Sequence, residues 1–180
     1  MPENESHITL GAISSCDTYP FWKKLARLFS DGEFWGDVLF YNYVQDIVGK
    51  GSRSRPTPRM WQSKAAINGF KEVLHTYKPQ RILVIGKTTW RYMAGAKEFP
   101  EGPPIEEPRF RFSEKFNSNL AQSEQCAYWY PTVKGQFALA APIYHPGYPA
   151  GFHQAETKRV VDRLLKSTWK APKVDSRVAA

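Results

Sequence analysis

One histidine, His145, stands in a stretch of conformationally restricted sequence. Residues 142–151 read PIYHPGYPAG, so tyrosines, prolines and glycines surround a single imidazole. An imidazole can donate or accept a hydrogen bond near neutral pH, and it can serve as a general acid or base. A rigid turn would preorganise that ring toward a bound group, as electrostatic catalysis requires. Alternatively, the turn only ends a strand and His145 has no chemical role.

Two other polar residues follow apolar runs. Asn42 lies within DVLFYNYVQ at residues 37–45, and Lys87 follows RILVIG at residues 81–86. The amide of Asn42 matches the Watson–Crick edge of a base, or it satisfies loop backbone. The ammonium of Lys87 could reach a phosphate or stay solvated. The chain has no Walker pattern, no GxGxxG and no Ser/His/Asp arrangement, so no motif supports nucleotide hydrolysis or dinucleotide binding.

The chain is strongly basic, with a net charge of +8 at pH 7 over 180 residues. The stretch KGSRSRPTPR at residues 50–59 holds four cations and no acid. A second group of cations runs along one late helix: Lys158, Arg159, Arg163, Lys166 and Lys170. Such clusters attract phosphate backbones. We therefore expect the partner to be DNA or single-stranded nucleic acid.

Other classes of protein are disfavoured. There is no run of 18 apolar residues and no basic-then-apolar leader, so we expect a cytoplasmic protein without a membrane span. The two cysteines, Cys16 and Cys126, cannot build a disulfide framework and have no metal-ligating neighbour at short spacing. We expect no metal or cofactor. The length suits one domain over residues 1–180, acting as a monomer.

The order of elements must position these polar residues. Apolar periodicity and capping residues predict helices over 16–31, from Thr57 to Pro79, in a short stretch after Thr88, and over 152–169. Strands are predicted over 37–45 and 81–86, with a hairpin around Lys134 and Gly135. Residues 95–125 read as an insertion loop and 171–180 as a frayed tail.

This alternation is typical of an α/β domain with a mainly parallel sheet. Ligands of such sheets bind beyond the carboxyl ends of the strands. We therefore expect one edge of the sheet to carry the polar residues that follow the strands, namely Asn42, Gln45, Gly86, Lys87 and His145.

Four segments in order also carry a family resemblance. VLFYNYVQ, RSRPTPRMW, ILVIGKTTWRYM and PIYHPGYP, followed by a basic helix, resemble the uracil-DNA glycosylase superfamily over residues 20–165. The resemblance implies a three-layer α/β/α sandwich around a mainly parallel four-stranded sheet. It also implies that the protein flips a deaminated base out of DNA and hydrolyses its N-glycosidic bond. One alternative is an inactive nucleic-acid-binding or nucleotide-binding module of the same fold. Another is a small-molecule α/β enzyme unrelated to DNA, whose binding would change little with salt.

The resemblance assigns roles by position. Asn42 matches the asparagine that hydrogen-bonds the flipped base, and His145 matches the histidine that donates to the uracil oxygen as charge develops. Gly147 and Tyr148 would line the minor-groove side. The cations expected to follow the nucleic-acid backbone are Arg53, Arg55, Arg59, Lys87 and Lys158.

The glycine-rich first motif of the superfamily, which holds the water-activating residue, has no counterpart in this chain. Either HITLGAISS at residues 7–15 is a divergent first strand, or the chain begins after that strand. Asp17 is the nearest carboxylate and is the candidate general base. Tyr19, Phe21 and Tyr43 are candidates for stacking on the base, or they belong to the core.

Overall fold

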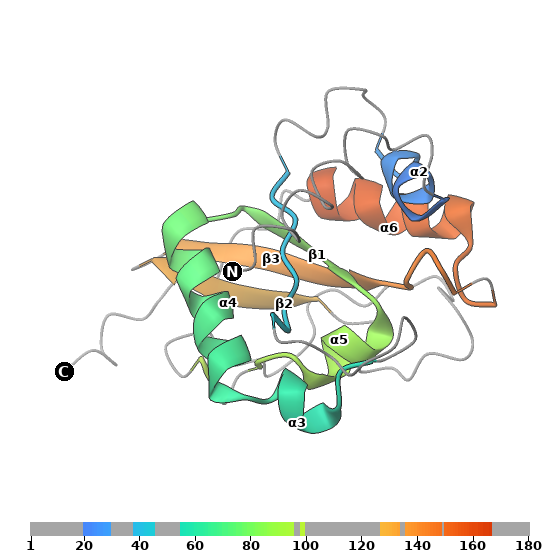
Figure 1. Ribbon diagram of the computed structural model, residues 1–180. Coiled ribbons are helices and arrows are strands. Elements are labelled where there is room, and N and C mark those ends of the chain that lie inside the picture. Colours follow the sequence, from blue (N-terminus) through green and yellow to red (C-terminus); the bar gives the residue numbers. More distant parts are fainter. Residues whose placement is uncertain are drawn as a thin grey trace.

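The protein is a mixed α/β structure with helices on both faces of an open sheet (Figure 1). The computed structural model describes residues 20–29, 38–45, 55–95, 98–99, 127–133, 136–148 and 150–166. Its helices are α2 (Pro20–Ala26), α3 (Pro58–Trp61), α4 (Lys64–Tyr77), α5 (Lys87–Tyr92) and α6 (Gln154–Lys166). Its strands are β1 (Arg81–Ile85), β2 (Tyr128–Val133) and β3 (Gln136–Ile143). None of the helices in these ranges is long and apolar enough to cross a membrane.

The described strands form one sheet in the order β1-β3-β2. β1 runs parallel to β3, with Leu83 opposite Ala141, and β2 runs antiparallel to β3, with Tyr128 opposite Ala140. The hairpin predicted from the sequence is therefore confirmed, and so is the strand predicted after Pro79. The sequence predicted a mainly parallel sheet of four strands. The described residues form three strands, with one parallel and one antiparallel pairing.

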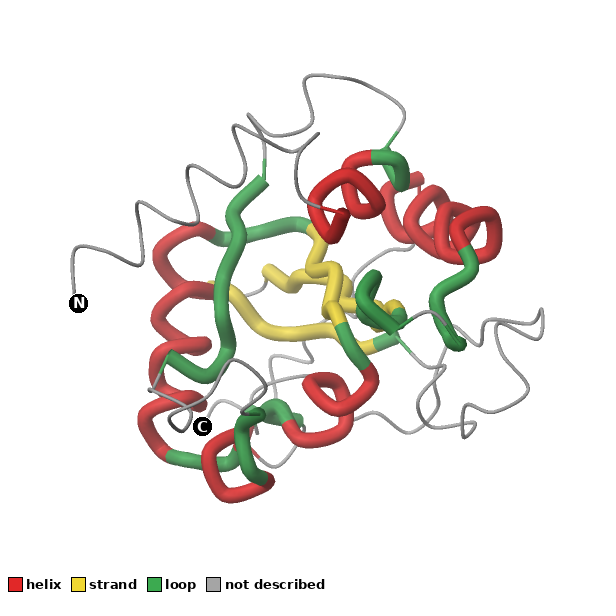
Figure 2. Tube along the Cα trace, turned by 45° about the vertical axis from the view of Figure 1, so that its right-hand side comes forward, coloured by secondary structure: helices red, strands yellow, loops and turns green. Residues whose placement is uncertain are grey.

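The central strand β3 separates two hydrophobic clusters. Leu139, Ala141 and Ile143 face α2 and α6, while Ala140 faces α4. Alternate residues of a strand point to opposite faces, so one apolar run can line both clusters. The alanines of β3 are fully buried, and their small side chains let helices approach the strand closely. Figure 2 shows helices on both sides of the strands.

The predicted helix between Thr57 and Pro79 is divided in two. Gln62 caps the C-terminus of α3, and the Ser63 hydroxyl accepts a hydrogen bond from the Ala66 amide at 3.2 Å, which begins α4. A serine at an N-cap satisfies a donor that the first turn leaves unpaired. α4 ends at Lys78, whose left-handed backbone (φ 46°) directs the chain toward β1.

The predicted strand over 37–45 is wrong for residues 38–45, which have no strand pairing in the structure. Phe40 packs edge-on against Trp22 at 4.8 Å, while Tyr41 and Tyr43 pack against Phe70 on the other side of the sheet. Aromatic residues favour strands because they fit a half-buried surface. In this segment helix side chains supply that surface, so the same residues pack without a ladder.

Two buried tyrosine hydroxyls form hydrogen bonds with the backbone of Ala94, shortly after the end of α5. The Tyr43 hydroxyl accepts from the Ala94 amide at 2.8 Å, and the Tyr130 hydroxyl donates to the Ala94 carbonyl at 2.5 Å. Burial raises the pKa of Tyr43 to about 12, because the charged phenolate would lose its hydration. These bonds connect residues 38–45 to β2 through the backbone of residue 94.

Several predictions from the sequence lie outside the described residues. They are the divergent strand at 7–15, nearly all of the insertion loop at 95–125, the turn at residues 134–135 and the tail at 171–180.

Leu164 and Leu165 are neighbours on α6 with opposite environments, 2% and 49% exposed. We predict that Leu164→Ala lowers the free energy of unfolding by about 2–5 kcal/mol, because it leaves a cavity between α6 and β3. Leu165→Ala should change that free energy by less than about 0.5 kcal/mol. Chemical denaturation of both variants measures the difference, and equal losses would contradict the placement of α6.

Candidate functional site

The parallel pair β1 and β3 brings two of the predicted loops together. The amide of Gly86, directly after β1, donates to the carbonyl of Ile143 at 2.8 Å. A Cβ placed on Gly86 would lie 3.9 Å from the Cβ of His145. Gly86 has a φ of +100°, a conformation that side chains disfavour, and this turn starts α5 at Lys87. Gly86, Lys87 and His145 therefore share one edge of the sheet, as the sequence predicted for these three residues. Asn42 and Gln45 were expected at the same edge because they would end a strand, but residues 38–45 form no strand in the structure.

The turn after β3 holds the imidazole of His145. The Tyr148 amide donates to the His145 carbonyl at 2.8 Å, which closes a four-residue turn. Within that turn the Gly147 amide donates to Nδ1 of His145 at 3.0 Å. An imidazole nitrogen that accepts a hydrogen bond carries no proton, so a neutral His145 has its proton on Nε2.

The electrostatics of the turn also favour a neutral imidazole. Burial lowers the pKa of His145 below its ordinary value, and the nearby Arg55 guanidinium lowers it further. The charged form is disfavoured because it loses hydration and lies near another cation. His145 nevertheless remains an exposed residue. The arrangement supplies a neutral N–H donor that a ligand can reach.

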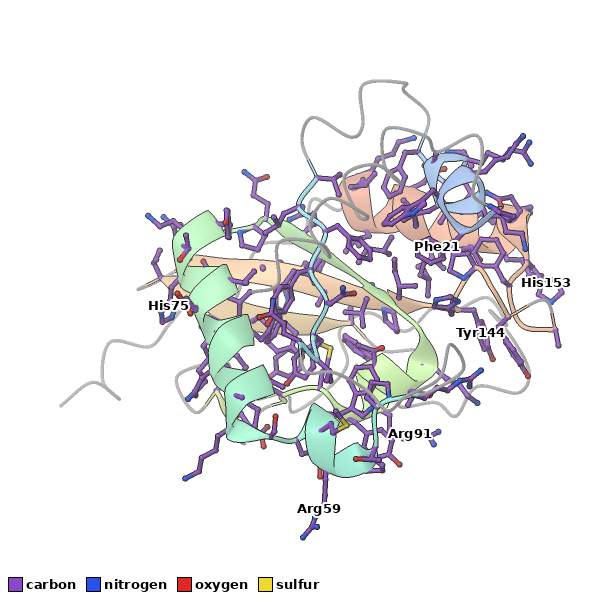
Figure 3. All side chains as sticks on the ribbon, viewed as in Figure 1. Phe21, Arg59, His75, Arg91, Tyr144 and His153 are labelled. Carbon is purple, nitrogen blue, oxygen red and sulfur yellow. The ribbon has the colours of Figure 1, made fainter. Side chains whose placement is uncertain are left out.

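Aromatic rings border the imidazole. The centre of the Phe21 ring, on α2, lies 5.1 Å from the centre of the His145 ring, and the two ring planes meet at 34°. Tyr148 is 52% exposed and stacks on Tyr144 at 5.9 Å. Figure 3 shows Phe21 and Tyr144 at the same end of the sheet, beside the loop that leads to α6. Of these rings Tyr148 is exposed, Phe21 is partly buried and Tyr144 is buried. An exposed ring near a hydrogen-bond donor suits a planar, polar ligand.

Gly151 permits the stacking of the two tyrosines. A Cβ at this position would lie 2.7 Å from ring carbons of both Tyr144 and Tyr148. Any side chain there would force the rings apart, so the glycine in this loop is required by packing. The sequence analysis did not single it out.

Lys24 of α2 is a further residue that the sequence analysis missed. Its ammonium donates to the carbonyl of Pro146 at 3.0 Å, and its own carbonyl accepts from Gln154 at 3.3 Å. The available signal was its spacing of three residues from Phe21, which places both side chains on one face of a helix.

The remaining predicted residues divide between the surface and the interior. Asn42 is exposed, whereas Tyr43 is a core residue that is only 6% exposed and stacks on Trp61 at 6.1 Å. Of the predicted cations, Arg55, Arg59 and Lys87 are exposed. Asp17, Tyr19 and Arg53 lie outside the described residues.

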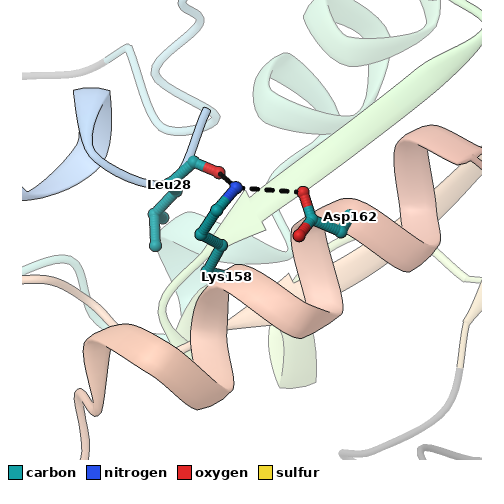
Figure 4. Close-up of polar contacts among 3 residues, drawn as sticks. All are labelled: Leu28, Lys158 and Asp162. Carbon is teal, nitrogen blue, oxygen red and sulfur yellow. Dashed lines mark hydrogen bonds and ion pairs between the residues drawn. The ribbon is translucent and has the colours of Figure 1, made fainter. Parts of the chain in front are cut away.

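Lys158 lies where α6 meets α2. Its ammonium pairs with Asp162 at 3.1 Å and donates to the Leu28 carbonyl at 3.4 Å (Figure 4). Both side chains of the ion pair are about one-third exposed, at 35% and 34%, so the pair contributes little to stability. The bond to Leu28 instead connects α6 to the turn that follows α2, on the same face of the sheet.

Among the described residues, no three His, Cys, Asp or Glu side chains gather as metal ligands would. The turn that carries His145 offers a hydrogen-bond donor, aromatic surfaces and nearby positive charge.

The lowered pKa of His145 predicts a pH dependence of stability. As the pH falls below about 6.5, the unfolded chain binds a proton on His145 before the folded protein does. The free energy of unfolding should therefore decrease over this range and level off below the lowered pKa. Chemical denaturation between about pH 5 and pH 8 measures the change.

His145→Gln should remove that component of the pH dependence. His75→Gln is the control, because His75 is exposed on α4 at the opposite end of the molecule (Figure 3). A pH dependence that is the same in wild type and His145→Gln would contradict the lowered pKa.

Comparison with protein-family models, with curated proteins and with solved structures finds no match to this chain. The case for a function therefore rests on the residues and geometry of the edge that carries His145.

Proposed function

We propose that this protein binds nucleic acid and excises a deaminated base, with His145 in contact with the base. The observation that carries the proposal is the state of His145. Its Nδ1 accepts a hydrogen bond from Gly147, which leaves Nε2–H as a donor at the sheet edge. The parallel β1–β3 pair and the helices on both faces of the sheet support the accompanying fold, a uracil-DNA-glycosylase-like sandwich.

The donor suits the chemistry of base removal. When the N-glycosidic bond breaks, the bonding electrons leave with the base, and negative charge develops on its carbonyl oxygen. A neutral N–H held toward that oxygen stabilises the charge without first transferring a proton. Water adds to the sugar carbon, its hydroxyl oxygen forming the new bond, and its proton is taken up by a base, for which Asp17 is our candidate.

The surroundings of His145 suit an unstacked nucleotide. The partly buried ring of Phe21 lies beside the imidazole, and Tyr148 offers an exposed ring on the same turn as His145. Asn42 would read the polar edge of the base. Stacking on aromatic rings is worth about 1–3 kcal/mol per base in single-stranded nucleic acids.

Positive charge completes the proposed site. Lys87 follows the turn at Gly86, and Arg55 lies close enough to His145 to lower its pKa. With Arg59 on α3, which packs against α5, these cations would contact the phosphate backbone on either side of the flipped base. Gly147 would allow that backbone to approach the turn.

One observation favours a second candidate function, a binding module without turnover. The charged group that acts on His145 within the described residues is Arg55. A guanidinium can hold a phosphate, but it stays protonated and cannot take a proton from water. In this alternative the protein retains a base or nucleotide at the same edge without breaking the glycosidic bond.

We predict that wild-type protein releases a base from DNA containing uracil, hypoxanthine or xanthine, and that His145→Ala slows release by about 100-fold or more. DNA affinity should remain nearly unchanged, because phosphate contacts dominate it. Single-turnover excision followed by cleavage of abasic sites measures the rate, and a thermal melt shows that the variant is folded. Binding without any released base in wild type would favour the module, and an unchanged rate in folded His145→Ala would exclude the catalytic role.

The salt dependence of binding should distinguish the cations. We predict that Lys87→Ala reduces the slope of log K against log salt by about 0.7–0.9, the value for one phosphate contact. Lys158→Ala should leave the slope unchanged, because Asp162 and Leu28 already engage its ammonium. Titration of fluorescent single-stranded DNA at several salt concentrations measures both slopes. Equal slopes in the wild type and Lys87→Ala would remove Lys87 from the interface.

A further inference from the structure

We infer that Lys24 is a positioning residue for His145: its ammonium holds the carbonyl of Pro146, while the same helix places Phe21 against the imidazole. The inference concerns how the donor is held, and its catalytic consequence rests on the proposed function. Lys24 does not touch the base or the water that would react. It acts through the turn that carries them.

The contacts of Lys24 all lead to the segment around His145. Its ammonium lies 3.0 Å from the carbonyl oxygen of Pro146, the residue that follows His145. It also lies 5.8 Å from the centre of the Phe152 ring, at the other end of the loop. Its backbone carbonyl accepts from the Gln154 side chain at 3.3 Å. One residue of α2 is thus bonded to both ends of the loop between β3 and α6.

The carbonyl that Lys24 holds belongs to a buried residue. Pro146 is less than 2% exposed, so its position is fixed within the packed interior. A charge-assisted hydrogen bond to a partly buried carbonyl is stronger than a neutral one. Loss of the ammonium would leave the Pro146 oxygen without this donor, and the turn would gain freedom at the residue between His145 and Gly147.

Helix α2 is itself anchored to the core. Trp22 and Leu25 are buried in the cluster shared with β3 and α6, at 8% and 4% exposed. Phe21 and Lys24 are three residues apart, so one helical face carries both to the His145 turn. The helix therefore holds the backbone of the turn through the bond from Lys24 to Pro146, and it holds the imidazole through the ring contact of Phe21.

A matched control lies next to it in the sequence. Lys23 has the same charge on the same helix and is exposed, whereas Lys24 is half-buried. Lys24→Met and Lys23→Met remove the same charge. Any effect of α2 charge on nucleic-acid binding is common to both, and the contact with Pro146 is lost only in Lys24→Met.

The first measurement is the tautomer of His145, observed by nitrogen-15 nuclear magnetic resonance on the full chain. We expect one tautomer, protonated at Nε2, in wild type and Lys23→Met, and a mixture of both tautomers in Lys24→Met. This readout needs no substrate, so it decides the inference even if wild type shows no excision. A merely structural role for Lys24 would lower the melting temperature and leave the tautomer of the folded state unchanged.

The second measurement is single-turnover excision of uracil from single-stranded DNA. We expect Lys24→Met to lower the rate by between about 10-fold and about 100-fold, as misplaced catalytic groups do, and Lys23→Met to leave it near the wild-type value. Lys24→Gln supplies a second variant if the methionine variant does not fold. Its shorter side chain should not reach Pro146, so the same changes are expected.

The wild-type tautomer of His145 in a folded Lys24→Met or Lys24→Gln protein would overturn the inference, whatever the excision rate. If the salt slope is then also smaller in Lys24→Met than in Lys23→Met, Lys24 is a phosphate contact instead.

Discussion

The parallel pairing of β1 with β3 is the constraint on which the candidate site depends. Parallel strands end at the same edge of a sheet, so the loops that follow them meet. In this protein the pairing extends one step past β1, where the Gly86 amide bonds to the Ile143 carbonyl. That bond places Gly86, the residue before Lys87, beside His145 although the two are far apart in the sequence. A shift of one residue in this register would move the alternating side chains of β3 to the wrong cluster.

The second requirement is a rigid support for the imidazole, and three elements provide it. β3 delivers the residue, the turn at 145–148 orients its ring through Gly147, and α2 closes over it with Phe21 and Lys24. A hydrogen-bond donor stabilises developing charge effectively only when it is already held in position before the reaction. The prolines and glycines of PIYHPGYPAG restrict or permit the backbone conformations that this arrangement needs.

The cations of this basic chain have different roles, which depend on where each one lies in the fold. Lys158 pairs with Asp162 and bonds to the turn after α2, and Lys24 bonds to Pro146, so part of the positive charge serves internal contacts. Arg55 instead acts on His145, where it favours the neutral imidazole. A net charge of +8 attracts polyanions from any direction. Which cations could contact a phosphate is decided by their neighbours in the fold.

The sequence by itself determined most of the local elements and the meeting of the Gly86 and His145 loops at one edge of the sheet. Helical periodicity, the residues after Pro79 and the apolar run before His145 predicted α2, α4, β1, β3 and α6, because these patterns follow from the repeat of each element. Only the tertiary structure shows that residues 38–45 form no strand. Their aromatic side chains could pack equally well against helices or beside a strand, so the sequence pattern did not distinguish the two. The burial of Tyr43 depends on the distant backbone of Ala94. The bond from Lys24 to Pro146 spans 122 residues, and no local pattern encodes a contact that exists only after α2 packs on β3 and α6.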